Sequence, residues 1–291
     1  MTEAPTVTGI AAVSEHYEDV AYEASEGIAV VTLDAPQRRN AFRVPMLVDL
    51  LRALDRADRD PAVRAVIVTG AGEAFSLGAA LDGPATLSKA LAEDLDGHTP
   101  TGYREPAGRI SERLFAMQKP VIAAFNGHAI GGGATIAAAM DIRIGSEKAR
   151  FGFVFNRRGV VPEGASSWFL PRLVGIGRAT DWILTGRVFD AAEAYEAGYL
   201  TRVVPADRVM TVAREYANQF VRDTSPTSVA LSKRLLASAW QYSHPGSAAA
   251  DESRAYASRV DSADAREGIM SFLEHRPAVF PPLDPSPAEK F

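Results

Sequence analysis

Two glycine-rich segments of the sequence could supply backbone N–H groups to a negatively charged oxygen. The first runs Phe75-Ser76-Leu77-Gly78-Ala79-Ala80-Leu81, and the second runs Ile130-Gly131-Gly132-Gly133-Ala134. Glycine lets a ligand approach the main chain closely, and a turn into a helix exposes N–H groups at the positive end of the helix dipole. Two such turns that face each other would form an oxyanion hole. Close backbone packing is the alternative that this spacing leaves open.

A carboxylate stands in an apolar stretch, in the run Val161-Pro162-Glu163-Gly164. Burial would raise the pKa of the Glu163 carboxyl group and make it a usable acid and base near neutral pH. The alternative is a glutamate that starts a helix, where the helix dipole favours a negative charge. Both interpretations fit the local sequence.

Two other patterns approach known motifs but are incomplete. The run Gly70-Ala71-Gly72-Glu73-Ala74-Phe75 lacks the last glycine of a dinucleotide-binding G-x-G-x-x-G sequence. The run Ala74-Phe75-Ser76-Leu77-Gly78 differs by one residue from the G-x-S-x-G nucleophile elbow of serine hydrolases. None of the five histidines stands in a recognisable triad context or at metal-ligand spacing. We therefore interpret residues 70–75 as a turn that ends a strand.

The composition excludes some classes of protein and disfavours others. The 291 residues include no cysteine, which rules out disulfides, thiolate nucleophiles and cysteine metal sites. The net charge is -5 and no dense run of Lys or Arg occurs, so no binding to nucleic acid or to a membrane is expected. The first basic residue, Arg38, follows several acidic residues, so neither a secretory signal nor a mitochondrial presequence is indicated and a cytoplasmic location is expected.

One stretch without charged residues, from Pro120 to Met140, is long and apolar enough to resemble a membrane span. It contains Asn126-Gly127-His128 and three consecutive glycines, each of which would cost about 1 kcal/mol inside a helix. We interpret the stretch as a buried strand, a glycine turn and the start of a buried helix.

Apolar runs alternate with helical patterns in the first half of the chain. Strands are expected at Ile28–Leu33, Ala65–Thr69, Val121–Phe125 and Ile142–Ile144. Leucine recurs at i, i+3, i+4 and i+7 over residues 47–54, which indicates an amphipathic helix. The alternation predicts an α/β fold with buried, largely parallel strands.

Two later regions differ from this pattern. Residues 83–110 are polar and rich in glycine and proline, which predicts a long irregular insertion. From about residue 207 the apolar spacing is helical, with helices expected around residues 209–220 and 229–236. The last 15 residues contain five prolines, so an extended tail is expected.

Several blocks along the chain resemble those of one enzyme family. They are Val31–Pro36 followed by Arg39-Asn40-Ala41, Val66–Gly70 followed by Phe75–Ala79, Lys119–Gly127 leading into the three glycines, the Pro162 segment, Leu170–Gly175, Leu184–Arg187 and Ser271–Glu274. Together they resemble the crotonase superfamily, the enoyl-CoA hydratase/isomerase family. The resemblance covers almost the whole chain, and the third block is the most specific.

This resemblance implies a fold of the α/β class, a crotonase-type spiral of repeated ββα units with a helical C-terminal trimerisation region. We accordingly expect an N-terminal extension over residues 1–20, a spiral core with the acyl-CoA site over 21–206, and the helical region over 207–291. The implied ligand is an acyl-CoA thioester, with coenzyme A as part of the substrate and no permanently bound cofactor or metal. The implied assembly is a homotrimer or a hexamer made of two trimers.

The resemblance also assigns catalytic roles. The oxyanion hole falls on the N–H groups of Ala79 and Gly132, which would bind an enolate oxygen more tightly than a ground-state carbonyl. Family hydratases carry two glutamates where this sequence has Thr135 and Phe155, so the pair that holds and splits water is absent there. Glu163 instead matches the glutamate that shuttles the proton in peroxisomal-type Δ3,Δ2-enoyl-CoA isomerases.

The predicted reaction is therefore the shift of a 3-enoyl-CoA double bond to the 2-position. Glu163 would take a proton from C2 and return it to C4 while the oxyanion hole holds the dienolate. The alternatives are hydration by Glu163 alone or with a group such as Glu105, and decarboxylation or thioester hydrolysis on the same fold. A non-catalytic acyl-CoA-binding protein is the alternative from another class.

Substrate-binding residues are expected around these groups. Phe153, Phe155 and Trp168 would form a dry acyl pocket, with ordinary core packing as the alternative for each. His275 replaces a family lysine that reaches coenzyme A phosphate, so Arg38 or Arg39 is the candidate for that charge, with surface solvation as the alternative. The full predicted set of substrate-binding residues is Arg38, Phe75, Leu77, Gly78, Ala80, Leu81, Gly131, Thr135, Phe153, Phe155, Trp168 and Phe272.

Overall fold

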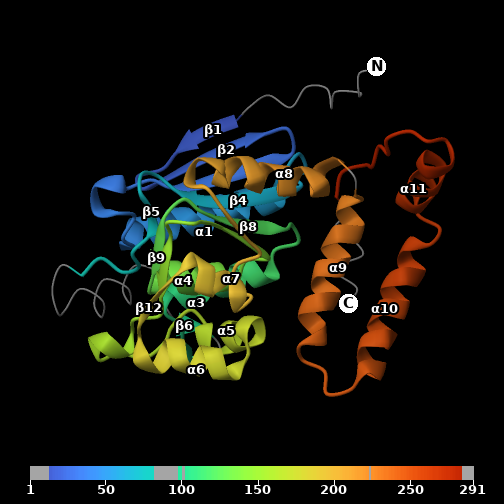
Figure 1. Ribbon diagram of the computed structural model, residues 1–291. Coiled ribbons are helices and arrows are strands. Elements are labelled where there is room, and N and C mark those ends of the chain that lie inside the picture. Colours follow the sequence, from blue (N-terminus) through green and yellow to red (C-terminus); the bar gives the residue numbers. More distant parts are fainter. Residues whose placement is uncertain (1–12, 82–97, 100–101, 223, 284–291) are drawn as a thin grey trace.

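A seven-stranded sheet forms the centre of the molecule, and a smaller four-stranded sheet packs against it (Figure 1). The computed structural model describes residues 13–81, 98–99, 102–222 and 224–283. The order in the large sheet is β1 (Val13–His16), β2 (Val20–Ser25), β3 (Ile28–Leu33), β4 (Ala65–Gly70), β8 (Val121–Phe125), β10 (Ile142–Ser146) and β13 (Arg202–Val204). The order in the small sheet is β12 (Val188–Asp190), β11 (Arg150–Gly152), β9 (His128–Ile130) and β5 (Ala74–Ser76). A hairpin of β6 (His98–Thr99) and β7 (Gly102–Tyr103) stands apart from both.

Helices surround these sheets. The longer ones are α1 (Val44–Arg59), α3 (Pro106–Ala116), α6 (Ile176–Thr185), α8 (Val209–Arg222), α9 (Pro226–Ala239), α10 (Pro245–Arg259) and α11 (Ala263–Leu273). The shorter ones are α4 (Gly132–Ala138), α5 (Ser166–Val174), α7 (Ala191–Glu196) and the 3-10 turns η1 (Pro36–Arg38), η2 (Asn156–Arg158) and η3 (Ala206–Arg208).

The large sheet is covered on both faces, as its almost continuous apolar strands require. Strands β3, β4, β8, β10 and β13 pair in parallel, and β1 and β2 add to the edge in antiparallel register. Side chains alternate along each strand, so that Ile28 and Val30 pack under α8 while Val31 and Leu33 face α1 and the small sheet. This two-sided burial confirms the predicted α/β class with largely parallel strands.

The four predicted strands are all present. Ile28–Leu33 and Val121–Phe125 have the predicted bounds, and the other two continue to Gly70 and Ser146. The charge-free stretch of residues 120–140 contains the predicted strand β8 and the predicted helix α4, and between them it forms an additional strand, β9, which was not predicted. Within the described ranges, no helix is both long and apolar enough to cross a membrane.

The regions outside the predicted core differ from expectation. Strand β1 and the first residue of β2 lie within the expected extension of residues 1–20, yet they pair into the large sheet. The insertion expected over 83–110 is irregular only in part, because α3 begins at Pro106; Glu105 caps it and Ile110 and Leu114 bury one face. Much of that insertion, residues 82–97 and 100–101, lies outside the described residues, as do residues 1–12 and the end of the predicted tail from residue 284.

The helical region after residue 207 divides into two parts. Helix α8 packs Val209, Ala213 and Ala217 on the large sheet and therefore belongs to the core rather than to a separate C-terminal unit. Helices α9, α10 and α11 instead extend away from the sheets (Figure 1). Only Ala255 of α10 is buried, so most of this helix is open to its surroundings.

The turn that leads into the small sheet is fixed by one buried side chain. Asn40 accepts a hydrogen bond from the Ala35 N–H at 2.9 Å and donates to the carbonyl groups of Ala71 and Ala74 at 2.9 and 2.8 Å. Its φ of 55° lies in the left-handed region, which asparagine tolerates better than most residues. The Ser76 hydroxyl donates to the Asn40 carbonyl at 2.8 Å, so β5 is anchored just before the first glycine segment.

Replacing this side chain is expected to destabilise the fold. Asn40→Ala would leave the Ala35 N–H and the Ala71 carbonyl without their side-chain partner and would remove the shorter of two hydrogen bonds to the Ala74 carbonyl. We expect the free energy of unfolding to fall by roughly 2–4 kcal/mol in urea titrations. The control is Asn126→Ala, because Asn126 donates to the same Ala74 carbonyl but is partly accessible, so water can replace it. Equal losses for the two variants would contradict the role given to Asn40.

Candidate active site

The two glycine segments meet at the point where β5 and β9 end. A Cβ atom added at Gly78 would lie 2.7 Å from the carbonyl oxygen of Ile130 and 2.9 Å from the nitrogen of Gly132. A Cβ atom added at Gly133 would lie 2.5 Å from the carbonyl oxygen of Ser76. Glycine is therefore needed on both sides of this contact, which brings the main chain of residues 78–79 next to the start of α4.

The N–H groups of Ala79 and Gly132 are oriented for a ligand. The Phe42 N–H donates to the Gly78 carbonyl at 2.6 Å, and the Ala80 N–H donates to the Phe42 carbonyl at 2.9 Å. In this parallel pairing the groups of the intervening Ala79 point away from Phe42. Gly132 is the first residue of α4, so its N–H has no acceptor within the helix. Neither N–H has an acceptor among the residues that the structure describes.

Glu163 lies beside this pair of N–H groups. A Cβ atom added at Gly132 would be 3.1 Å from Glu163 Oε1, and the Thr135 hydroxyl donates to the same oxygen at 3.4 Å. Burial of the carboxyl group, together with the nearby charge of Glu105, raises the pKa of Glu163 to about 7, and the Thr135 hydrogen bond opposes this shift. A carboxyl group with this pKa can both accept and release a proton near neutral pH.

A second carboxylate, Glu105, contacts the turn that carries Glu163. It lies at the N-terminal cap of α3, where one oxygen accepts from the Gly108 N–H and the other accepts from the Gly164 N–H at 2.7 Å. Burial raises the pKa of Glu105, and the two backbone hydrogen bonds oppose this. The site therefore contains two carboxyl groups from separate elements.

The remaining small residues of the two segments have mixed positions. Gly131 has φ 55° and ψ −125°, a conformation that favours glycine, and its N–H donates to the Gly152 carbonyl at 2.8 Å. Ala80 is buried, Leu77 is partly buried and Leu81 is exposed. Asp82, the acid near the oxyanion segment, lies outside the described residues.

Phe75 and Ser76 have structural roles. The Phe75 ring is fully buried against Phe125, with ring centroids 4.8 Å apart, so it packs in the core rather than lining an open site. Ser76 is also fully buried, and its hydroxyl accepts from the Gly78 N–H at 3.1 Å. Residues 71–73 form the turn between β4 and β5. Over the described ranges, no group of three or more His, Asp or Glu side chains could hold a metal ion.

The three aromatic residues predicted to line one acyl pocket all belong to the main hydrophobic core or pack against it. Phe153 is fully buried and stacks on Trp182, with ring centroids 6.4 Å apart. Trp168 packs edge-to-face on Phe169, with ring centroids 4.8 Å apart. Phe155 precedes η2 and is buried. Core packing, the alternative noted for each residue, accounts for these contacts, and an acyl pocket formed by the three stays a prediction.

Arg38 and Phe272 also lie apart from the carboxyl groups. Arg38 forms an ion pair with Asp19 and donates to the Ala41 carbonyl at 3.1 Å, so its charge is already compensated. Arg39 is exposed. Phe272 is 77% exposed on α11, which lies at the far end of the C-terminal helices from α4 and α5 (Figure 1).

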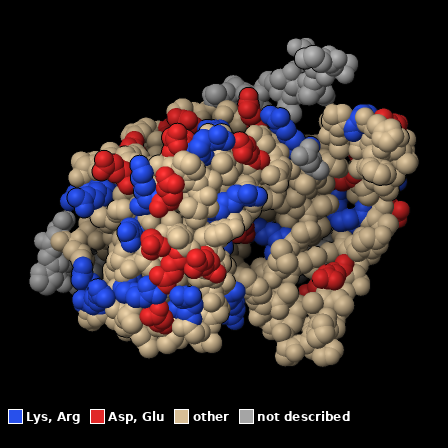
Figure 2. All heavy atoms as spheres, viewed as in Figure 1, with Lys and Arg blue, Asp and Glu red and all other residues tan. Residues whose placement is uncertain are grey.

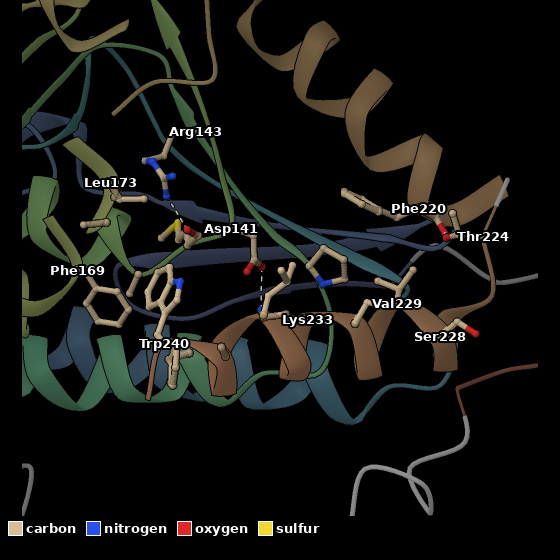
Figure 3. A pocket seen from close by; sticks show the side chains of 18 residues that line it. Asp141, Arg143, Phe169, Leu173, Phe220, Thr224, Ser228, Val229, Lys233 and Trp240 are labelled. Atoms are coloured by element: carbon tan, nitrogen blue, oxygen red, sulfur yellow. Dashed lines mark hydrogen bonds and ion pairs between the residues drawn. The ribbon is translucent and has the colours of Figure 1, made fainter. Parts of the chain in front are cut away.

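A separate cavity of about 580 Å³ lies between α9 and the core (Figure 3). Its lining is mostly apolar and includes Phe169 and Trp240, which extend into it. The ion pair between Lys233 and Asp141, at 2.7 Å, crosses its wall. Among its described lining residues there is neither Glu163 nor any residue of the two glycine segments.

Sequence reasoning missed several residues that shape the site. Glu105 was named only as a possible partner in hydration, not as the acceptor of the Gly164 N–H. Ser111 is fully buried, its hydroxyl has no partner among the described residues, and it lies 3.4 Å from where a Cβ atom on Gly164 would be. Such contacts join residues far apart in sequence, so no local pattern signals them. One local signal did exist for Glu105: a side-chain acceptor followed by proline, here Pro106, is typical of the start of a helix.

Comparison with known proteins agrees with this architecture. Residues 23–282 match the family model described as enoyl-CoA hydratase/isomerase. Enoyl-CoA hydratase ACTT3 of Alternaria alternata is 36% identical over 253 residues, which are 87% of this chain and 82% of that protein. The crystal structure of enoyl-CoA hydratase from Bacillus anthracis is 29% identical with a TM-score of 0.80, covering 91% of this chain and 99% of that one. The structure of DspI from Pseudomonas aeruginosa is 29% identical with a TM-score of 0.81, covering 91% and 98%.

The mixed sheets, the helical C-terminal region and these likenesses define a crotonase fold. The chain belongs to the enoyl-CoA hydratase/isomerase family of the crotonase superfamily. It is thus an enzyme of a family that acts on coenzyme A thioesters, which agrees with coenzyme A as a part of the substrate.

The raised pKa of Glu163 predicts a pH-dependent stability. The pKa rises from an ordinary 4.5 to about 7, so between these values the folded protein holds a proton that the unfolded chain has released. This contribution is fully present below about pH 4.5 and is lost as the pH rises through 7, by up to roughly 3 kcal/mol. We expect Glu163→Gln to gain stability relative to the wild type between about pH 5 and pH 8 in urea titrations. A difference that is constant over this range would contradict the assignment.

Proposed function

We propose that the protein shifts the double bond of a 3-enoyl-CoA to the 2-position. The thioester carbonyl would bind the N–H groups of Ala79 and Gly132, which are oriented for a developing negative charge. Glu163, beside Gly132, would take a proton from C2 and return it to C4. The observation that carries the proposal is one carboxyl group with a pKa of about 7, adjacent to this pair of N–H donors.

Hydration is the second candidate, and two observations favour it. The relatives compared above include proteins named enoyl-CoA hydratase. Glu105 also lies close enough to act on Glu163 electrostatically, so a second carboxylate is present, although not at the family's usual positions. Against it, both oxygens of Glu105 already accept backbone N–H groups, whereas the hydratase reaction uses two carboxylates to hold and split a water.

A direct product assay separates these reactions. The purified protein would receive a 3-enoyl-CoA and, separately, a 2-enoyl-CoA, with products followed by chromatography. We expect conjugation of the 3-enoyl ester, and a loss of roughly a hundred- to ten-thousand-fold in kcat in Glu163→Gln with binding of the ester retained. Glu147→Gln, which changes an exposed carboxylate, is the matched control and should keep the wild-type rate.

Other outcomes of this assay point elsewhere. Conversion of only the 2-enoyl ester to a 3-hydroxyacyl ester would identify a hydratase with a relocated acid and base. Turnover of other thioesters only, such as malonyl-type esters, would favour decarboxylation or hydrolysis. Binding of a coenzyme A ester without turnover of any of them would favour a non-catalytic acyl-CoA-binding protein.

We also propose that the chain assembles as a homotrimer or as a hexamer of two trimers. Helices α10 and α11 expose many apolar side chains, namely those of Tyr256, Val260, Ile269, Met270, Phe272 and Leu273. Figure 2 shows charged atoms of both signs interspersed over the core, while large areas of the C-terminal helices are uncharged. An apolar surface of this kind is typical of an interface. A contact between Phe272 and substrate would then cross from one subunit to another.

The assembly can be measured by light scattering after size-exclusion chromatography. We expect a mass three or six times the chain mass of 31.1 kDa. The double variant Ile269→Glu with Phe272→Glu should give smaller species, because it places charges in the interface. Ile176→Glu, an exposed apolar position on α6, is the control and should not. A monomeric wild type would contradict the proposal.

A further inference from the structure

We propose that Glu105 is a positioning residue for Glu163, which it serves by tethering the Pro-Glu-Gly turn to α3 and by placing a second negative charge beside it. The inference rests on the proposed function only in naming Glu163 as the group that transfers the proton. The hydrogen bond from the Gly164 N–H to Glu105 and the charge of Glu105 affect the turn whether or not that reaction is the right one.

The tether follows from the geometry of the α3 cap. Asn, Asp and Ser are the usual capping residues, because a short side chain is enough to reach a backbone N–H of the first turn. Glu105 caps α3 through the Gly108 N–H and still presents its other oxygen to the Gly164 N–H at 2.7 Å. The additional methylene of glutamate allows one side chain to join two elements that are 59 residues apart. A cap alone does not require this length.

The turn that Glu105 holds has an unfavourable main-chain conformation. Gly164 has φ of 63° and Ala165 has φ of 52°, so a non-glycine residue is in the left-handed region two positions after Glu163. Such a residue costs on the order of 1 kcal/mol and persists when surrounding contacts fix it. The contacts here are the Glu105 hydrogen bond, the packing of Gly164 against Thr135, and the Ser166 N–H and hydroxyl, which donate to the Glu163 carbonyl at 3.0 and 2.7 Å.

The second part of the role is electrostatic. Both oxygens of Glu105 accept backbone N–H groups, which favours its ionised form and opposes the upward shift of its pKa by burial. Glu163 accepts only the longer Thr135 hydrogen bond among its described contacts, so it is the carboxyl group that gains by taking a proton. The negative charge of Glu105 raises the pKa of Glu163, in the same direction as burial does. Glu105 thus acts as a fixed negative charge, and Glu163 acts as the carboxyl group that takes up and releases a proton.

Other charged side chains around the turn are directed to different partners. Arg104 pairs with Glu112 at 2.9 Å, and the charges of both affect the pKa of Glu105 rather than that of Glu163. Arg157 and Arg158 of η2 donate to carbonyl groups outside the turn. Arg172 of α5 lies over an indole ring of its own helix. Glu105 is therefore the charged group that raises the proton affinity of the Glu163 carboxyl group.

The first test needs no catalytic turnover. Three parent proteins are compared: the wild type, Glu105→Gln and Glu112→Gln. For each parent, the free energy of unfolding is measured by urea titration across pH with and without the added substitution Glu163→Gln, and the difference between the two is recorded. In the wild type this difference should change as the pH rises through about 7, the pKa of the Glu163 carboxyl group, and should level off above it. We expect the change to end about one pH unit lower in the Glu105→Gln parent, because the neighbouring charge is gone. In the Glu112→Gln parent, which loses a charge on the same helix, it should end at the wild-type pH.

The second test uses Glu105→Asp, which keeps the charge and the cap but is one methylene too short to reach the Gly164 N–H. With a 3-enoyl-CoA substrate we expect kcat to fall about tenfold while KM stays within about twofold, since the oxyanion hole is intact. In the pH profile of kcat/KM, the acidic limb should shift less from its wild-type position in Glu105→Asp than in Glu105→Gln, because Asp keeps the charge. A purely structural role would lower the rate equally at every pH and would leave the limb in place.

Each outcome decides one of the two parts. An unchanged pH range in the Glu105→Gln parent, or an equal shift with Glu112→Gln, would overturn the electrostatic role. A wild-type kcat in Glu105→Asp would overturn the tether, and this variant also carries the test if Glu105→Gln does not fold. If the wild type fails to convert 3-enoyl-CoA while the stability measurement still shifts, the proposed reaction is wrong and the role of Glu105 stands.

Discussion

An added Cβ atom at Gly78 would collide with the main chain of both Ile130 and Gly132. This close approach of two backbone segments is the constraint on which the site depends, because it brings the N–H groups of Ala79 and Gly132 to one place. The parallel pairing of β5 with β9 and the Asn40 hydrogen bonds hold the segments at that separation. Both N–H groups belong to the main chain, so the oxyanion binding that we propose for them would cost no side-chain entropy.

Opposing effects act on the Glu163 carboxyl group once the backbone is in place. Its proximity to the start of α4 and the Thr135 hydroxyl both favour the charged form. Burial and the charge of Glu105 favour the protonated form, and they prevail, since the pKa rises to about 7. Helix α4 has only seven residues and the Thr135 hydrogen bond is long at 3.4 Å, so the stabilisation of the anion is modest. The result is a carboxyl group with a pKa near neutrality, as the proposed proton transfer requires.

The sequence predicted the parts of the fold that local patterns govern. Apolar strands bounded by glycine, and the three glycines that interrupt a charge-free stretch, placed β8 and the start of α4 correctly because turn chemistry is local. Strand β9 was not predicted, because its three residues lie between the glycines that indicated a turn. The oxyanion pair came from a family resemblance, and the structure adds the orientation of its N–H groups. The tether from Glu105 to Gly164 spans 59 residues and was invisible to local reasoning. The ring contacts of Phe153 and Trp168 could not be predicted for a related reason, since the sequence shows that both residues are apolar but not which neighbours each one meets.

The arrangement of the two carboxylates also bears on which chemistry the fold supports. A hydratase needs both groups to contact one water, so Glu105 would have to exchange a backbone partner for that water. Each hydrogen bond to a charged group contributes about 1.5–3 kcal/mol, and release of the Gly164 N–H would also free the strained turn after Glu163. The proposed double-bond shift needs one mobile proton and one oxyanion hole, and the candidate groups for both are in place without any rearrangement. The hydrogen bond that orders the turn therefore fits the proposed single-base proton transfer better than it fits hydration.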